Sequence, residues 1–218
     1  MEVQMQIEAT GPFACFTRPE SRSERMSYPF ITPSAAIAIV SSILWKPEIR
    51  WEVSKIEVLQ NIQFINVKKN ELKGSAIIRR ASAPPIDITK HREQRNSSIL
   101  KDVAYRITFE PYLTDKGRSD RRNTISKYKE QFQRRLEKGQ FFHLPYFGCR
   151  EFTAFVKPAT KQKPIRYTSD FGFMFYNRFY PDDNPELSQK VKMFFFRAVM
   201  NEGVVLVPSR KEIMGVYA

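Results

Sequence analysis

The sequence predicts an α+β protein with an N-terminal domain of strands and helices and a C-terminal extension rich in β-strands. Three observations lead to this prediction. Several segments alternate apolar and polar residues, the period of half-buried strands, and two repeat apolar residues at helical spacing. The last part of the chain is rich in aromatic strand formers. With 218 residues, 42% of them hydrophobic, the chain can bury a core, which excludes wholesale disorder.

The first half of the chain is predicted to contain a strand, a helix and further strands. Residues 3–8 alternate and are followed by a glycine–proline turn. An N-cap threonine and an early proline precede the apolar run at 35–45, and Pro47 stops it. Alternation returns at 49–64, where we expect strands.

A strand, a helix and a strand are then expected further along the chain. Residues 103–109 alternate as a half-covered strand would. A helix is expected from Thr124 to Lys138, because threonine is a favoured N-cap, Gly139 ends the segment and one face is apolar. A fourth strand at 150–156 completes the order β-α-β-β-α-β, the split ferredoxin-like plan, which is common among RNA-binding proteins.

This order predicts two structural units. Residues 1–156 form a ferredoxin-like (RRM-like) domain and residues 157–218 form a C-terminal β-sheet extension, with strands at 171–180 and 191–200. The N-terminal domain carries an inserted basic loop at 68–101, where nine lysines and arginines accompany three acidic residues. A proline pair and a serine pair in this stretch favour a mobile loop.

The chain is strongly basic, with 36 lysines and arginines against 23 acidic residues, a formal net charge of +13 and a pI near 9.8. This excess favours a polyanionic partner, nucleic acid first and an anionic membrane second, over a merely basic surface. Most of it lies in two segments, with +6 at 68–101 and +5 at 121–138. A charged helix face is often only solvated, but together with the basic loop it favours phosphate binding. The predicted face comprises Lys127, Gln131, Arg134 and Lys138, with Arg135 beside it.

Membrane, secretory and metal-binding classes are disfavoured. No run approaches the ~18 to 20 apolar residues of a membrane span, so no membrane partner is expected. The first residues alternate like a strand and lack the basic and apolar regions of a signal peptide, which predicts a cytoplasmic protein. Cys15 and Cys149 lie far apart without metal-ligand spacing, so two ordinary thiols are expected rather than a zinc site.

The residue types present favour metal-free RNA cleavage over metal-dependent cleavage. No clustered carboxylates or histidines suggest a metal site, and no cofactor is predicted. Attack by the RNA 2′-hydroxyl needs only a base to take its proton and a cation to stabilise the pentacovalent phosphate. Neither histidine is an obvious catalyst, because His91 lies in the basic loop and His143 lies among aromatic residues.

Lys127 and Tyr128 are the best candidates for this chemistry, since together they offer an ammonium and a phenol to one phosphate. The alternative is that Tyr128 is a core residue whose hydroxyl reaches the edge, because it falls on the apolar stripe of the predicted helix.

Three segments of the sequence resemble one known family. They are FTRPE through ERMSY to ITPSAA at 16–36, LWKPEI at 44–49, and RRLEKGQ running into PYFGCREF at 134–152. In this order and spacing they resemble the CRISPR-associated "Cas five" family of the type I-C (Dvulg) subtype, in the repeat-associated RNA-binding (RAMP) superfamily. The similarity runs over nearly the whole chain.

The resemblance implies a fold and a function. It implies a ferredoxin-like domain with a β-rich extension. It also implies an endoribonuclease of antiviral defence that cuts precursor CRISPR RNA once per repeat without metal, leaving a 2′,3′-cyclic phosphate and a 5′-hydroxyl. Such a protein stays on the 5′ handle of the mature crRNA as a subunit of the type I-C interference complex, beside its other subunits.

The catalytic residues implied by the family are only partly present. The family pattern has a tyrosine before Trp-Lys-Pro and a Lys-His pair at the start of the second helix. Here Leu44 replaces the tyrosine and Tyr128 replaces the histidine, while Lys127 matches. If cleavage occurs, Tyr128 takes the acid–base role, with Tyr28 or His91 as helpers. A phenol with a pKa near ~10 is a poor base unless a cation such as Lys127 lowers it, so we expect a slower enzyme.

The alternative function is a noncatalytic crRNA-binding scaffold subunit, favoured by Leu44. Nonspecific duplex DNA binding by the same basic surface is compatible with either function. The residues expected to contact RNA are Arg18, Arg22, Arg25, Tyr28, Lys90, His91, Arg92, Arg121, Arg122, Gln131, Arg134, Arg135 and Lys138.

Overall fold

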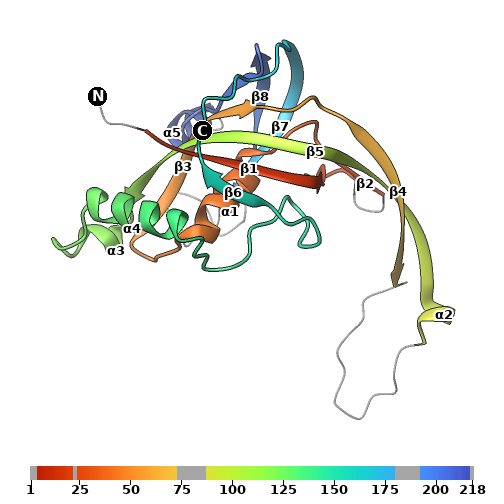
Figure 1. Ribbon diagram of the computed structural model, residues 1–218, viewed down its shortest axis with the longest axis horizontal. Coiled ribbons are helices and arrows are strands. Elements are labelled where there is room, and N and C mark those ends of the chain that lie inside the picture. The colour runs from red at the N-terminus through yellow and green to blue at the C-terminus, as the bar shows by residue number, and fades with distance from the viewer. Residues whose placement is uncertain (1–3, 22–23, 73–86, 180–191, 217–218) are drawn as a thin grey trace.

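A computed structural model describes residues 4–21, 24–72, 87–179 and 192–216 (Figure 1). These residues form one mixed sheet with helices packed on it. The strands are β1 (Met5–Ala14), β2 (Arg25–Met26), β3 (Ile49–Val58), β4 (Phe64–Leu72), β5 (Arg92–Leu113), β6 (Phe155–Pro158), β7 (Ser169–Phe179), β8 (Lys192–Asn201) and β9 (Val204–Leu206). The helices are α1 (Pro33–Ile43), α2 (Ile88–His91), α3 (Asp115–Arg118), α4 (Ile125–Glu137) and α5 (Arg210–Val216).

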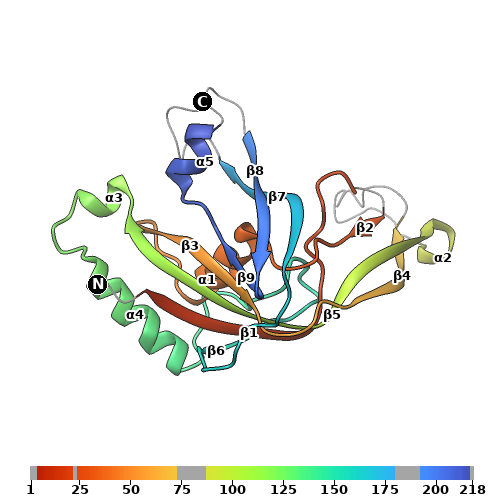
Figure 2. The ribbon, with the colours of Figure 1, turned by 90° about the horizontal axis from the view of Figure 1, so that it is seen from above.

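The sheet has the strand order β6-β1-β5-β3-β9-β8-β7, with β2 and β4 also paired to β5. The pairs are antiparallel except that of β2 with β5. Helix α4 packs against β5 and β6, and α1 packs against β3, β7 and α4. Figure 2 shows β7 and β8 standing away from the long curved β5. The mixed composition and the mostly antiparallel sheet confirm the predicted α+β class.

Helix α4 follows the prediction closely because its signals are local. Thr124 is the N-cap, and its side chain accepts a hydrogen bond from the Lys127 amide at 3.3 Å. Gly139 adopts a φ of 61°, the left-handed conformation that ends helices. The backbone amide of Gln140 then donates to the Arg135 carbonyl at 2.8 Å, which satisfies one of the free carbonyls at the end of the helix.

Three aromatic rings fix α4 on the sheet. Trp51 of β3, Phe109 of β5 and Phe132 of α4 lie with ring centroids 5.0 to 5.5 Å apart in tilted or edge contacts. All three side chains are buried. Pairs of this kind contribute about 0.5–1.5 kcal/mol beyond the area they bury. The start of α4, where the candidate site lies, is therefore anchored to the centre of the core.

The predicted loop at 68–101 is wrong at both ends. Strand β4 continues to Leu72 and β5 begins at Arg92, and the two pair in register from Phe64 with Leu100 to Leu72 with Arg92. This two-stranded ribbon, defined by those pairs, projects from the body (Figure 1). Neither of its faces is fully buried, so charged residues fill positions that apolar residues occupy in core strands. The middle of the predicted loop, 73–86, lies outside the described residues.

The predicted fourth strand is displaced. Strand β6 begins at Phe155 rather than at residue 150 and pairs with β1. The preceding residues form a compact loop, in which the Phe147 amide donates to the Phe152 carbonyl at 2.8 Å. Phe152 and Ala154 are buried by this loop, so the apolar alternation came from loop packing instead of a strand.

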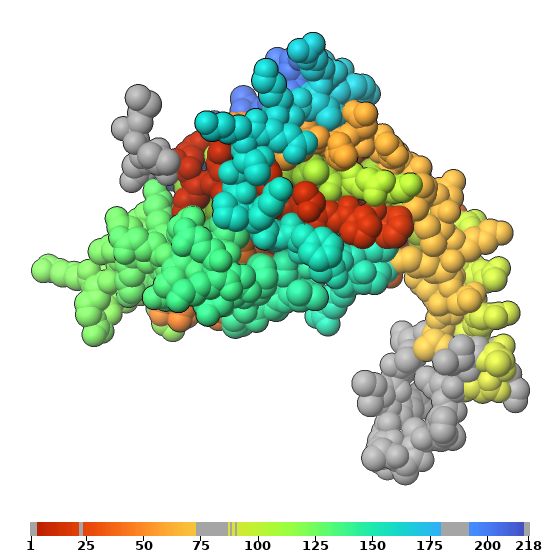
Figure 3. Space-filling view, viewed as in Figure 1, coloured from red at the N-terminus to blue at the C-terminus, as the bar shows by residue number. Residues whose placement is uncertain are grey.

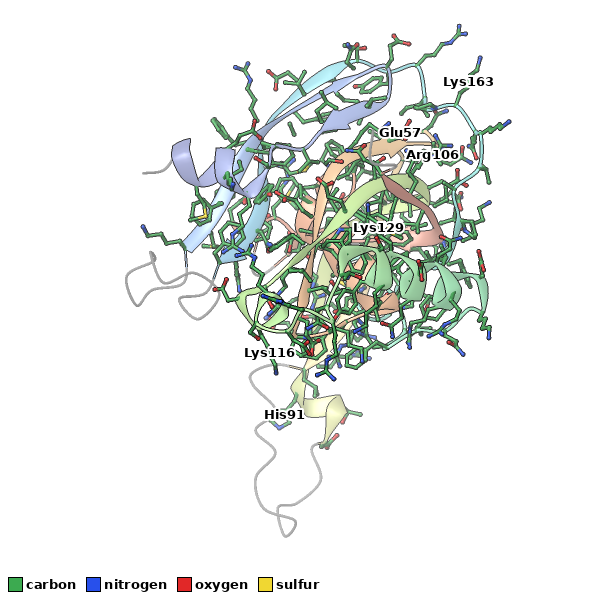
Figure 4. All side chains as sticks on the ribbon, turned by 90° about the vertical axis from the view of Figure 1, so that its left-hand side faces the viewer. Glu57, His91, Arg106, Lys116, Lys129 and Lys163 are labelled. Carbon is green, nitrogen blue, oxygen red and sulfur yellow. The ribbon has the colours of Figure 1, made fainter. Side chains whose placement is uncertain are left out.

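Within β5, residues 103–109 are covered on both faces, whereas a half-covered strand was predicted there. Arg106 is buried on the polar face and donates to Glu8 at 2.9 Å, to Glu57 at 3.4 Å and to the Gln162 carbonyl at 2.5 Å. Thr108 is also buried there. The segment after β6 crosses this face, which is why its polar residues are inaccessible to water. Figure 4 shows Glu57 and Arg106 close together on neighbouring strands.

The C-terminal strands agree with prediction, whereas the short helices α2 and α3 and the C-terminal helix α5 were missed. Strands β7 and β8 correspond to the predicted 171–180 and 191–200. Strand β9 pairs with both β8 and β3, which joins these strands to the rest of the sheet. Helix α5 was not predicted. Within the described ranges, no helix is both long and apolar enough to cross a bilayer.

Candidate nucleic-acid interface

The start of α4 brings together the two residues predicted to act on a phosphate. The Tyr128 hydroxyl donates to Asn123 Oδ1 at 2.7 Å, and Lys127 Nζ donates to the same oxygen at 3.2 Å. Lys127 Nζ also lies 5.2 Å from the centre of the Tyr128 ring. Lys127 is exposed, whereas Tyr128 is only 3% exposed. One amide oxygen therefore holds an accessible ammonium beside a nearly buried phenol.

The electrostatic environment keeps Tyr128 protonated. Burial raises the pKa of Tyr128, and the negative charges of Glu48 and Asp120 raise it further. The lowered pKa that Tyr128 would need to act as a base is therefore not provided. Glu48 Oε2 is buried and finds no hydrogen-bond partner in the part of the chain that the structure describes. At neutral pH the phenol is a proton donor and a very weak base.

Arg121 and Arg122 precede α4 and are both exposed. Arg122 is already engaged with Asp120, through hydrogen bonds of 2.9 to 3.1 Å. These bonds lower the pKa of Asp120 to about 2. Arg121 is left as the more available charge for a phosphate, since no carboxylate among the described residues pairs with it.

Further along α4, Gln131 and Arg135 border a hollow of about 270 Å³. Arg135 Nε donates to the Ile43 carbonyl at 2.6 Å, so this arginine also ties α4 to the end of α1. Arg134 and Lys138 are exposed on the same helix. Leu44, at the position of the family tyrosine, is 2% exposed at the base of the hollow. The other lining residues are Trp45, Lys46, Pro47 and Phe142.

A second basic area lies around Arg18, Arg25 and Tyr28. The Arg18 guanidinium lies 5.0 Å from the centre of the Tyr28 ring. The Tyr28 hydroxyl accepts from the Phe175 amide at 3.2 Å, and burial raises the pKa of Tyr28. Arg25 donates to the Cys149 sulfur at 3.1 Å. Arg18 and Arg25 line a depression of about 640 Å³; the predicted Arg22 lies outside the described residues.

A third group, Lys90, His91 and Arg92, lies at the tip of the ribbon. Figures 1 and 2 show this tip and α4 at opposite ends of the molecule, and Figure 3 shows the two surfaces separated on one face. Figure 4 places His91 well away from Lys129 of α4. His91 is therefore not positioned to assist Tyr128. The predicted RNA-contacting residues therefore lie in three areas, of which the one around Arg25 adjoins the ribbon through an ion pair of 3.6 Å with Glu71.

Sequence reasoning missed four residues at the site. Asn123 lies in a turn-rich stretch where asparagine is expected for turn geometry alone, so its role in holding Lys127 and Tyr128 gave no signal. Glu48 and Phe142 lie in or near segments used for the resemblance but carry no helical or strand period, and Trp45 ends the apolar run at 35–45, where a core position was expected. Among the residues described, no three histidine, cysteine, aspartate or glutamate side chains are grouped to hold a metal ion.

Comparisons with known proteins place the chain in a family. Residues 5–208 match the model for the CRISPR-associated protein Cas5, of the Cas5d type. The chain therefore belongs to the Cas5 family of CRISPR-associated proteins.

Two curated relatives carry the name CRISPR pre-crRNA endoribonuclease Cas5d. The relative from Thermus thermophilus is 37% identical over 225 residues, which cover 95% of this chain and 93% of the relative. The relative from Mannheimia succiniciproducens is also 37% identical, over 95% of this chain and 96% of its own length. A solved structure of a CRISPR-associated protein superposes with a TM-score of 0.70 at 24% identity, covering 97% of this chain and 94% of that one.

Proposed function

We propose that this protein is an endoribonuclease that cleaves precursor CRISPR RNA within the repeat and remains bound to the 5′ handle as a subunit of the type I-C interference complex. Family membership and the names of the two relatives support this function. The observation that carries it in this chain is the Lys127–Tyr128 pair, held by one Asn123 oxygen at the exposed start of a basic helix.

The fold proposal is a ferredoxin-like domain at 1–156 with a C-terminal β-sheet extension at 157–218. The antiparallel strand order β6-β1-β5-β3, with α1 and α4 as the two connecting helices, supports it. Strand β6 spans the proposed boundary, because its last residue paired to β1 is Pro158. The extension adds β9, β8 and β7 to the sheet beyond β3.

The proposed reaction needs no metal. The 2′-oxygen attacks the adjacent phosphorus, a new O2′–P bond forms, and the P–O5′ bond breaks to leave a cyclic phosphate. Lys127 neutralises charge on the phosphate as the pentacovalent state forms. The protonated Tyr128 gives its proton to the departing 5′-oxygen, a role that a raised pKa favours. A solvent base takes the 2′-proton, so the reaction is slow.

The test is incubation of the purified protein with its cognate repeat RNA in EDTA, beside Lys127→Ala and Tyr128→Phe. Loss of a general acid lowers rates about 10²- to 10⁴-fold. Lys129→Ala is the matched control, because it removes an equal charge from the same helix, whereas the hydrogen bond to Asn123 comes from Lys127. We expect the wild type and Lys129→Ala to cleave and the other two variants to lose most activity. Normal cleavage by Tyr128→Phe would assign Tyr128 to the core.

The second candidate is a noncatalytic crRNA-binding scaffold. Leu44 favours it, because a buried leucine cannot transfer a proton. If the wild type leaves repeat RNA intact at high enzyme excess yet binds it, the scaffold function stands and the nuclease proposal fails. Duplex DNA binding is tested by competition at fixed salt; equal affinity for repeat RNA and unrelated duplex would count against a dedicated handle binder.

A further inference from the structure

Two exposed aromatic rings lie beside the basic face of α4. The Trp45 side chain is 48% exposed and Phe142 is 61% exposed, although both are large apolar groups. Their ring centroids are 5.6 Å apart and their planes differ by 27°, so the rings are stacked. The proposed cleavage chemistry at Lys127 and Tyr128 does not use them.

We propose that Trp45 and Phe142 form a stacking site for one unpaired base of the repeat RNA. This inference rests on the proposed function. It adds that the protein prefers RNA that is single-stranded at the nucleotide contacting Trp45 and Phe142. Unpaired bases are bound in proteins by stacking on aromatic faces, which every base can do.

The rings are held in place by the backbone around the end of α1. The Phe142 amide donates to the Ser42 carbonyl at 2.6 Å, which fixes the loop that carries Phe142. The Leu44 carbonyl accepts from the Trp51 indole at 2.8 Å, which fixes the residue before Trp45. Little conformational freedom of the backbone therefore remains to be lost when a base binds, and this favours affinity.

The surroundings of the rings favour RNA over a protein partner. The hollow of about 270 Å³ that Trp45 and Phe142 border is also lined by Lys46, Gln131 and Arg135, and none of the described residues that line it is acidic. Lysine and arginine supply charge for the phosphates, and the glutamine amide can donate to or accept from a base edge. A protein-docking patch is typically depleted of lysine at its core.

The hollow is also close to the proposed chemistry along the helix. Gln131 follows Lys127 by four residues, so it lies about one turn further along the same face, about 6 Å along the helix axis. A base stacked at the hollow thus belongs to a nucleotide next to, or very near, the phosphate at Lys127. Stacking there would place the scissile phosphate in a defined register.

The first experiment uses the fluorescence of the protein itself. The chain has two tryptophans, and Trp51 is buried in the core. Titration with repeat RNA is expected to quench the Trp45 emission, and the quenching is expected to vanish in Trp45→Phe. Unchanged emission at saturating RNA would show that no base lies on the ring and would overturn the proposal.

The second experiment measures RNA affinity. Trp45→Ala and Phe142→Leu are expected to bind repeat RNA about 5- to 150-fold more weakly, the range for loss of one stacked base. Phe142→Leu keeps apolar bulk without an aromatic face, and Leu144→Ala is the control, an exposed apolar residue on the same loop. Each variant is compared with wild type in thermal unfolding, and Phe142→Tyr, which keeps the ring, is expected to bind normally.

An abasic scan identifies the ligand. Each of these repeat RNAs lacks one base at a different unpaired position, and each is titrated against wild type and Trp45→Ala. At one position, removal of the base should weaken binding to wild type but should not weaken binding to the variant any further. If Trp45→Ala weakens binding of every abasic RNA equally, the stacking proposal is wrong. If the isolated variants bind all RNAs like wild type, the rings dock a protein subunit instead.

Cleavage assays on the same preparations separate the two proposals. Normal cleavage and binding by Trp45→Ala and Phe142→Leu would overturn the stacking site and leave the proposed function intact. A wild type that neither binds nor cleaves repeat RNA would overturn both.

Discussion

Replacing Arg106 with methionine tests the buried charge cluster on the polar face of the sheet. The Arg106 side chain is 8% exposed and donates to two carboxylates, Glu8 and Glu57, on the strands at either side. Methionine has a similar length but no charge and no donor, so the substitution leaves both carboxylates without their shared partner. Glu8 keeps its hydrogen bonds from Thr160 and an outer contact with Lys157 at 3.6 Å.

The expected cost follows from that loss. Removal of one partner from a buried ion pair costs about 3–5 kcal/mol, because the remaining charge stays in a poorly solvated site. For a chain of this length, each kcal/mol shifts the melting temperature by about 2–4 °C, so Arg106→Met should melt roughly 6–20 °C below wild type. Thermal unfolding followed by circular dichroism measures the shift, and urea unfolding measures the free energy.

The pH dependence identifies the cause. Burial tends to raise the pKa of Glu8, but hydrogen bonds from Thr160 and Arg106 outweigh it and leave that pKa below the ordinary 4.5. In wild type this carboxylate stabilises the fold above pH 4.5, and the contribution is lost as the pH falls through the lower folded pKa. Without Arg106 the Thr160 bonds still oppose burial, but the pKa of Glu8 rises above its wild-type value, so Glu8 is protonated at a higher pH in the variant and the deficit should shrink as the pH falls. A deficit below about 1 kcal/mol, or one independent of pH, would refute this reasoning.

Three further predictions concern the loops, the chemistry and the basic helix. Gly148→Ala should unfold the protein, because its φ is 77° and a Cβ would lie 2.0 Å from the Cys15 carbonyl oxygen. Gly139→Ala, at φ 61° in open space, should lower the free energy of unfolding by only about 1–2 kcal/mol. Equal melting temperatures of the two variants would contradict this. The cleavage rate should rise with pH as solvent base becomes available and fall only above pH 10.0, where Tyr128 with its raised pKa loses its proton. The ratio of the wild-type rate to the Tyr128→Phe rate should also fall there, because loss of any other proton affects both proteins, and a constant ratio would contradict the role of Tyr128. Replacing both Arg134 and Lys138 with glutamine should lower the slope of log affinity against log salt by about 1.4 for single-stranded RNA, and an unchanged slope would show that neither residue contacts phosphate.

The parts of the fold that could be predicted depend on nearby residues. Helix α4 has its cap, its apolar stripe and its terminal glycine within one short segment, and all three signals agree. The family resemblance likewise depends on short motifs. Strands β7 and β8, predicted from their content of aromatic strand formers, were also found for this reason.

The features that were missed depend on distant residues. The ribbon of β4 and β5 is held by backbone hydrogen bonds between the two strands, and no periodic pattern of apolar side chains predicts this pairing. The burial of Arg106 requires Glu8, Glu57 and Gln162, which are 98, 49 and 56 residues away in sequence. At the candidate site, Lys127 and Tyr128 were found from their residue types. The Asn123 oxygen that joins them and the carboxylate of Glu48 that acts on Tyr128 follow only from the folded positions.

The pairing pattern of β5 has a consequence for the order in which the protein folds during synthesis. Strands β1 to β4 all precede β5 in the chain, and among the named strands each of them pairs with β5 and none pairs with another of the four. A nascent chain that has not yet emerged from the ribosome through Leu113 therefore has four strands and no ladder between them. Sheet formation starts late and closes long loops, which makes folding slow and leaves apolar edges uncovered in the meantime. The chain is thus expected to depend on chaperones most while its first half is being made.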